Sequence, residues 1–298
     1  MAQPYRTTRS DAVLSDAALW RRREKCDTPP PIFDDPGKLR NRPSAMIRST
    51  VIASALCLAV LPCTAAAAGE AEFLAGQSKT CVKCALGKVS MKRRELGGVD
   101  LAGADLAKAV FHRSRLIGAK FAGADLTGAN LNKTDLKNAS FVDIKGAGAM
   151  FYESDLSVAN FTGADLVEAK MGKARMVRTI LDRAKLTEAI LTGARLDDAS
   201  LRGAELQRAN LVGTSLRGAN LEGANLEDSG LVDAVLRDAN LEGANLSGAD
   251  LFGADLTGAN LAGADLSESR LSRAILTDAN LTGVNLKGAL MPDGTTHE

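Results

Sequence analysis

Cysteine and histidine are the residues of this sequence best suited to redox or metal chemistry, and few of them lie together. Cys81 and Cys84 form a Cys-x-x-Cys pair. This spacing serves as a local disulfide, as a redox pair or as half of a zinc site. No second cysteine pair or nearby histidine completes a tetrahedral site, and the two histidines, His112 and His297, lie far apart in the sequence. We therefore expect no metal site and no histidine-based catalytic triad.

Other patterns that could carry catalysis or bind cofactors are absent or accidental. No glycine-rich phosphate loop follows an expected strand, and the glycines recur at the period of a repeat, so short glycine motifs match by chance. The aspartates also recur at that period, and none forms a distinguishable pair of catalytic carboxylates. The sequence predicts a protein without catalytic residues and without a cofactor.

The composition bounds the class of protein. The chain has 298 residues, of which 45% are hydrophobic, and this excludes wholesale disorder. Aromatic residues make up only 4%, which is few for a compact core. With 37 basic and 36 acidic side chains the formal net charge is +1, so the whole-chain charge gives no support to a nucleic-acid partner.

The first third of the chain has three segments of different composition. Residues 1–45 are polar and proline-rich, and we interpret them as disordered or as an extension upstream of a true start at Met46. Residues 46–68 have a basic start, an apolar run and three alanines before Gly69, the pattern of a secretory signal peptide. The alternative is an uncleaved anchor in the inner membrane, and 46–68 is the only predicted membrane contact. Residues 69–95 then form a cap that contains the cysteine pair.

A strict five-residue period fills residues 96–291, and residues 292–298 form a short tail. Every fifth residue from Leu96 to Met291 is apolar: of 40 positions, 31 are Leu, five are Phe and three are Met, and only Gly146 interrupts the series. Alanine is typical two positions before each of these centres, Asp or Asn one before, and Gly two after. The expected weak point is the segment around Gly146, where we predict a local distortion with the five-residue register continuing.

The period selects the backbone path. In an α-helix, successive centres would step by about 140° and spiral around the whole surface. In a flat strand they would alternate between the two faces, because five is odd. A chain that turns a corner every five residues buries all of them on one side. The sequence therefore predicts an all-β coil around a central axis, with glycine at the corners.

The unit Ala-(Asp/Asn)-Leu-x-Gly, as in residues 244–248, resembles the repeat of the pentapeptide-repeat family. The resemblance implies a right-handed quadrilateral β-helix with 20 residues per coil, and so about ten coils over 96–291. Residues 20 apart then stack in columns. Phe121, Phe141 and Phe161 form one column inside the coil, and Phe111 and Phe151 share another. A further column holds Asn220, Asn240, Asn260 and Asn280, and we interpret these columns as structural.

The resemblance also bears on the cap, because cysteine pairs just before the first repeat are similar to those of exported family members. A Cys81–Cys84 disulfide is the leading interpretation, and a redox pair and a metal site are the alternatives. We expect residues 70–77 to form a short helix or turn over the open end of the coil, with Phe73 and Leu74 packed on the first coil.

Charge is distributed unevenly along the coil, and this distribution distinguishes between two functional hypotheses. Residues 91–220 carry 20 basic and 15 acidic side chains, whereas residues 221–298 carry four basic and 13 acidic ones. The leading hypothesis is a non-enzymatic scaffold, periplasmic or secreted, whose acidic C-terminal third binds an unidentified protein. The alternative is the family's cytoplasmic DNA mimic, which binds topoisomerase. Members of that class are acidic along much of their length, and here only the final third is acidic.

Overall fold

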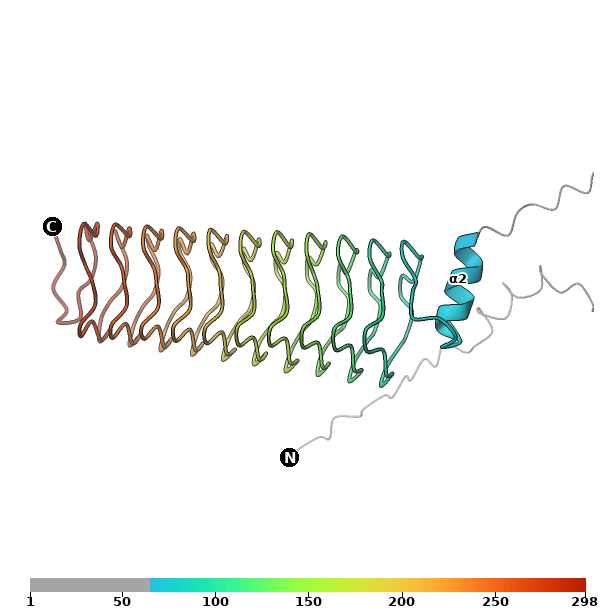
Figure 1. Cartoon of the computed structure of the whole chain (residues 1–298). Coiled ribbons are helices and arrows are strands. Elements are labelled where there is room, and N and C mark those ends of the chain that lie inside the picture. The colour runs from blue at the N-terminus through green and yellow to red at the C-terminus, as the bar shows by residue number, and fades with distance from the viewer. Residues whose placement is uncertain (1–64) are drawn as a thin grey trace, which may run out of the picture. The chain divides into compact units, whose positions relative to one another are not determined.

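The computed structural model describes residues 65–298, so the predicted extension 1–45 and most of the predicted signal segment lie outside the described residues. Within that part of the chain one helix, α2 (Ala65–Leu74), precedes a long regular coil (Figure 1). None of the helices in this part of the chain has the length and apolarity that a membrane crossing requires. The last residues of the predicted signal segment, from Ala65 on, belong to α2.

The coil is built from one repeated turn. Nearly every apolar centre is followed by a β-turn in which the residue three positions later donates its N–H to the carbonyl of the centre, as Ala249 does to Leu246 at 3.0 Å. The residue two positions after the centre has a positive φ, for example 68° at Gly248. Glycine adopts this left-handed conformation without a steric penalty, which explains its frequency at that position.

Parallel β-bridges hold one coil on the next. Every fifth residue pairs with the residue 20 positions further along, from Thr80 with Asp100 to Arg270 with Leu290. Each bridge is one residue long, so the strands are as short as a four-sided coil allows. Hydrogen bonds of 2.6–3.1 Å join most successive coils on every side. The period of 20 residues per coil that the resemblance implied is the period of the structure.

The interior of the coil is filled by the centres and by the small residues three positions after them. The leucines from Leu101 to Leu271 at centre positions are fully buried, and so are most of the intervening alanines. At some alanine positions a Ser or Thr is buried instead, and its hydroxyl donates to a backbone carbonyl. Thr134, Thr179 and Thr214 donate to the carbonyl 23 residues earlier. The interior is therefore apolar, with each of these hydroxyls hydrogen-bonded.

The structure extends the coil beyond the predicted boundary. Pairing begins at Thr80, so the first coil lies inside the predicted cap of residues 69–95. Cys81, Leu86 and Met91 are buried at centre positions of that first coil. The sequence prediction began the coil at Leu96 and assigned Leu86 and Met91, which already share its five-residue register, to the cap.

The predicted distortion at Gly146 is wrong. Lys145 pairs with Asp125 on one side and with Asp165 on the other, and Gly146 keeps its hydrogen bond to Asp165 at 2.7 Å. The space of the missing side chain is occupied, since a Cβ at Gly146 would lie 3.2 Å from Ile144 Cδ1 and 3.0 Å from Leu166 Cδ2. Ile144 stands where the repeat has alanine and is buried. Ile144, which is larger than the usual alanine, therefore fills the space that the usual leucine would occupy at position 146.

The final coil is only partly covered. Leu290 pairs in the antiparallel direction with Thr296, and His297 exchanges backbone hydrogen bonds with Gly288 and Ala289. The tail thus covers one side of the last coil. On another side Leu281, at a centre position, is 37% exposed.

Candidate interaction surface

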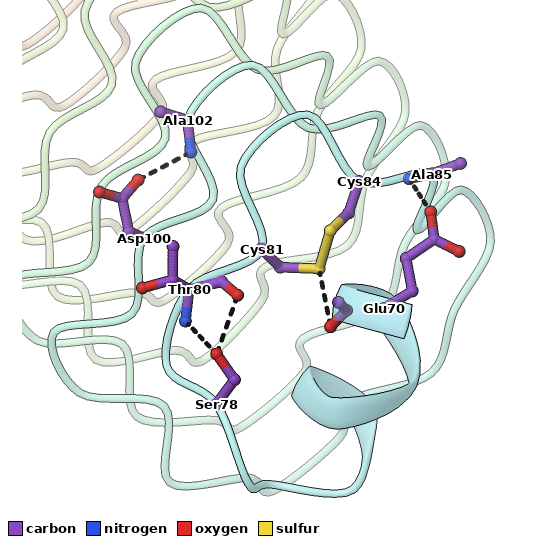
Figure 2. Close-up of a disulfide and its surroundings, with 9 residues drawn as sticks. Glu70, Ser78, Thr80, Cys81, Cys84, Ala85, Asp100 and Ala102 are labelled. Atoms are coloured by element: carbon purple, nitrogen blue, oxygen red, sulfur yellow. Dashed lines mark hydrogen bonds between the residues drawn. A yellow bond between two sulfur atoms is a disulfide. The ribbon is translucent and has the colours of Figure 1, made fainter. Parts of the chain in front are cut away.

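Helix α2 covers the first coil and is fixed to it by polar and apolar contacts (Figure 2). The Glu70 carboxylate accepts a hydrogen bond of 2.7 Å from the backbone N–H of Ala85. At the C-terminal end of the helix, the Arg94 guanidinium donates a hydrogen bond to the carbonyl of Leu74 at 3.0 Å. A cation at this end also interacts favourably with the partial negative charge of the helix dipole. Phe73 is buried as expected, but Leu74 is 39% exposed, so its predicted packing is wrong. A helix presents neighbouring residues in different directions, and only Phe73 faces the coil.

Cys81 and Cys84 are joined by a disulfide with an S–S distance of 2.07 Å (Figure 2). Cys81 occupies a centre position and Cys84 the alanine position three residues later, so the disulfide spans one turn on the inward side. Both cysteines are at least 96% buried beneath α2. The disulfide therefore takes the place of the Leu–Ala contact that fills the later coils.

The predicted phenylalanine columns are visible as ring contacts. Phe121 and Phe141 are stacked with centroids 4.9 Å apart, and Phe141 and Phe161 with centroids 4.4 Å apart. Phe151, in the other column, meets Phe141 and Phe161 edge to face at 5.9 and 5.8 Å. Such geometries stabilise aromatic pairs beyond the area they bury. All five rings are fully buried, so they are structural and present no surface.

The predicted asparagine column is a hydrogen-bonded ladder on the outside of the coil. Asn240 donates from Nδ2 to Oδ1 of Asn220 at 3.3 Å, Asn260 to Asn240 at 3.0 Å, and Asn280 to Asn260 at 2.9 Å. Each Oδ1 also accepts the backbone N–H two residues later, as from Glu222 to Asn220 at 3.0 Å. The amides both close their own turns and connect successive coils.

A second ladder lies one side further round, and the sequence analysis missed it. Asn245 donates to Asn225 at 3.2 Å and Asn285 donates to Asp265 at 3.0 Å. The same 20-residue spacing would have revealed it. Asp265 interrupts this ladder, because a carboxylate has no N–H to donate to Asn245.

One corner of the coil combines positive charge with apolar surface. It is formed by the turns that follow Met91 and every twentieth residue after it, and we call it the Tyr152 corner. Its first three coils carry Lys92, Arg93, Arg113 and Lys133 at these turns. Further along lies a groove of about 390 Å³ that is lined by Asn132, Met150, Tyr152, Lys170, Gly172, Lys173, Ile190 and Thr192.

Tyr152 and Ile190 give the groove its apolar character. They are 37% and 41% exposed. Lys173 lies over the Tyr152 ring, with Nζ 5.9 Å from the centroid, a cation–π contact. Further along the same corner Arg270 covers Phe252, with its guanidinium carbon 4.4 Å from the ring centroid.

Comparison with family models identifies the repeat. The model for pentapeptide repeats matches in eight copies between residues 95 and 291, about two thirds of the chain. This chain belongs to the pentapeptide-repeat family. Its coil is the right-handed quadrilateral β-helix that the resemblance to that family implied.

Solved structures of pentapeptide-repeat proteins are similar to the chain. HetL from Nostoc sp. strain PCC 7120, described as involved in regulating heterocyst differentiation, is 33% identical over 76% of this chain and 97% of its own, with a TM-score of 0.49. A trypsin-treated form of QnrB1, a plasmid-mediated fluoroquinolone resistance protein, is 22% identical over 67% of this chain and 90% of its own, with a TM-score of 0.39. A comparison with curated proteins gives no significant match.

The acidic third of this pentapeptide-repeat coil has carboxylates in two kinds of position. Some stand one residue before a centre and are used locally: Asp250, Asp255 and Asp265 each accept the backbone N–H two residues later. Others stand in the turns. Glu227 and Glu242 are exposed, and Glu222 is half-buried and forms an ion pair with Arg202, with 3.4 Å between Nη2 and Oε2. The second group forms the surface that a basic partner would meet.

Two local hydrogen-bond donors hold the pKa of Asp265 below its ordinary value. Ser267 is the main cause, through its side chain and its backbone N–H, and Asn285 adds to it against the smaller opposing effect of burial. Asp265 therefore stays ionised over a wider range of pH than a free carboxylate.

The metal and redox alternatives for the cysteine pair can be compared with its surroundings. Between residues 65 and 298 there is no group of three or more His, Cys, Asp or Glu side chains that could hold a metal ion. The two cysteines are buried, and Cys81 Sγ lies 3.9 Å from the backbone carbonyl oxygen of Gly69. Such surroundings suit a buried structural disulfide.

Proposed function

We propose that this pentapeptide-repeat protein is a non-enzymatic scaffold that binds a basic partner protein through its acidic C-terminal third. The observation that carries the proposal is the division of the coil into a filled apolar interior and a polar exterior. Because the interior leaves no room for a ligand, any function lies on the outer surface. Exposed carboxylates at the turns of the C-terminal coils are the most uniform charged feature there.

The proposed location is the periplasm or the outside of the cell. The signal-like composition of residues 46–68 supports it, and the Cys81–Cys84 disulfide agrees with an oxidising compartment. Determining the N-terminus of the protein in fractionated cells by mass spectrometry tests this. A start at Gly69 in the periplasmic fraction is expected, and an intact cytoplasmic chain would contradict it.

Titration with a basic polypeptide tests the binding surface. We expect poly-lysine to bind the protein at low salt, and a Glu222→Gln, Glu227→Gln, Glu242→Gln triple variant to bind several-fold more weakly. Two of these carboxylates are exposed and Glu222 is half-buried on the outer surface, so the variant retains its fold. A matched triple variant at exposed acidic residues of earlier coils, Glu153→Gln, Glu168→Gln and Glu188→Gln, is the control. Equal loss in both variants would show that the acidic third has no special role.

DNA mimicry is the weaker alternative, because the described coil also carries a basic corner. A mimic of duplex DNA needs negative charge along its length. An assay of DNA supercoiling by a topoisomerase distinguishes the two functions. We expect no inhibition, whereas inhibition that the triple Glu→Gln variant abolishes would support mimicry.

A further inference from the structure

The first coil carries a cation at three of its four corners. Lys83, Lys88 and Arg93 occupy successive positive-φ positions, with φ of 57°, 62° and 54°, and the fourth corner has Gly98. The corners separate different sides of the coil, so the three cations surround its N-terminal end. All three residues are exposed. We call Lys83, Lys88 and Arg93 the cationic ring.

The carboxylates near the cationic ring do not neutralise it. Between residues 65 and 298 no ion pair involves a residue of the ring. Glu95 and Asp100 pair instead with cations of the second coil, at 4.0 and 3.7 Å. On α2, Glu70 accepts a backbone hydrogen bond, and Glu72 is the other carboxylate. Residues 69–95 carry six basic and three acidic side chains, so this end of the coil is positive.

Exposed apolar side chains lie at the same end. Leu74 and Val82 are 39% and 46% exposed. Val82 directly precedes a ring residue in the same turn, and Arg94, which directly follows another, donates to the carbonyl of Leu74. In the sequence, the apolar run within residues 46–68 also leads into this end. Cations beside exposed apolar side chains are typical of proteins that bind at the interface of a membrane.

We infer that the N-terminal end of the coil rests on a membrane surface with anionic headgroups. Helix α2 covers this end, and a helix with its side chains is about 10 Å wide. The Debye length at physiological ionic strength is about 8 Å, and lysine and arginine have long, flexible side chains. A membrane that touches α2 therefore lies within the electrostatic reach of the cationic ring, and Leu74 and Val82 add apolar contact with the headgroup region.

The charge of the opposite end favours this orientation. Residues 221–298 carry four basic and 13 acidic side chains. An anionic surface attracts the first coil and repels the last ones, so the acidic third is directed away from the membrane. It then remains free for the basic partner proposed above. The two proposals rest on different residues, so either can fail without the other.

The position of the ring favours a lipid surface over a nucleic acid. Proteins bind nucleic acids by phosphate contacts along a groove or a face, often with aromatic side chains on which bases stack. The three cations lie at three different corners of one coil, and the exposed apolar residues beside them, Leu74 and Val82, are aliphatic. A plane across the end of the coil is near all three cations at once.

Cosedimentation of the full chain with lipid vesicles tests the surface. The measured quantity is the ratio of the partition coefficients for phosphatidylglycerol and phosphatidylcholine vesicles, because an apolar segment elsewhere in the chain binds both lipids alike. We expect a preference for phosphatidylglycerol of at least about tenfold at low salt, and its loss at high salt. Equal binding to both kinds of vesicle overturns the proposal.

Charge variants test the role of the cationic ring. Replacing all three ring residues by glutamine should lower the ratio about tenfold. The matched control removes the same charge from exposed arginines of later coils and should leave the ratio unchanged; it consists of Arg178→Gln, Arg183→Gln and Arg217→Gln. Equal losses in the two triple variants, or none in the ring variant, overturn the proposal. Thermal unfolding verifies that each variant is folded.

Two further measurements test the orientation and the class of partner. Val82→Asp should lower the ratio several-fold, because it places a carboxylate against the anionic surface. Ile180→Asp is its control, since Ile180 is 39% exposed on a later coil, and an equal effect of both changes overturns the end-on orientation. Binding of a short duplex DNA is measured with the same variants. If the ring variant loses DNA binding but keeps its preference for phosphatidylglycerol, the ring serves a nucleic acid and the proposal is overturned.

Discussion

Residues other than glycine hold the left-handed position at many turns of the coil. Most are long or polar, but Val158 is β-branched and has a φ of 61°. Branching at Cβ makes this conformation especially costly. Val158 is 44% exposed, so it gains little from burial in return. The neighbouring coils therefore hold the backbone of Val158 at a positive φ that valine disfavours.

Val158→Gly should therefore stabilise the protein. The gain from removing strain is about 1 kcal/mol, reduced by the greater freedom of glycine in the unfolded chain. The midpoint of thermal unfolding measures it. Val142→Gly is the control, because Val142 occupies the preceding, negative-φ position of its turn, and this change should destabilise the protein. Destabilisation by Val158→Gly would show that the turn is not strained.

Asp265→Asn should complete the second ladder and remove a dependence on pH. Asparagine keeps the acceptor used by Ser267 and Asn285 and gains a donor toward Asn245, worth about 1 kcal/mol. Because the pKa of Asp265 is lowered on folding, its stabilising effect is present above the ordinary carboxyl pKa and is lost as the pH falls through the folded value. Unfolding by denaturant near neutral pH and in acid tests this. The variant should lose less stability in acid than the native chain, and an equal loss would contradict the assignment.

At the scale of the repeat element, Ile144 and Gly146 act as one unit. The coil there is regular because Ile144 fills the space that a leucine at position 146 would fill elsewhere. The two positions belong to the same side of the coil, so their sizes are free to exchange as long as the total volume is kept.

A double-mutant cycle measures that compensation. Ile144→Ala leaves a cavity and should cost about 2–4 kcal/mol, and Gly146→Leu overpacks the same space and should cost about 1–3 kcal/mol. The double variant restores the usual repeat and should be close to the native stability. Free energies of unfolding from denaturant titration give the coupling. Additive losses would show that the two side chains do not share one space.

The coil and helix α2 differ in how far the sequence predicts them. The period from Leu181 to Leu286 requires a corner every five residues, and this predicts the coil. The register of 20 residues per coil and the Phe121 and Asn220 columns come from the resemblance to the pentapeptide-repeat family. The repeat pattern does not predict that Ile144 fills the space left by Gly146. The pattern gives the residue type expected at each position, but not the volume that two positions fill together. Leu74 was misplaced because the direction of a side chain on α2 depends on how the helix is docked. The first coil was assigned to the cap although Leu86 and Met91 share the five-residue register, because Cys81 and Cys84 stand there in place of Leu and Ala.

At the scale of the whole molecule, the two ends of the coil differ in how they are closed. Helix α2 covers the first coil through Phe73, Glu70 and Arg94, with the disulfide beneath it. The last coil is covered on one side by the tail and leaves Leu281 partly exposed. Opening of the coil should therefore begin at the C-terminal end.

Removing the disulfide should weaken the N-terminal cap without unfolding the coil. A loop of four residues restricts the unfolded chain little, so Cys81→Ala with Cys84→Ala should lower the unfolding midpoint by only a few degrees. Hydrogen exchange should rise in residues 69–95 and stay unchanged from 120 to 260. Ser78→Ala, close to the pair but outside it, is the control. Faster exchange throughout the coil would show that the disulfide supports the entire molecule.

The pairing of residues only 20 apart determines how the chain can fold. Every parallel bridge is complete once the following coil has been made, so no segment waits for a distant partner. The typical contact spans about 7% of the chain, a value usual for helical bundles and low for a β-protein. Each finished coil offers its edge as a template for the next. A chain that emerges N-terminus first releases each coil before the next one, so winding can advance in one direction.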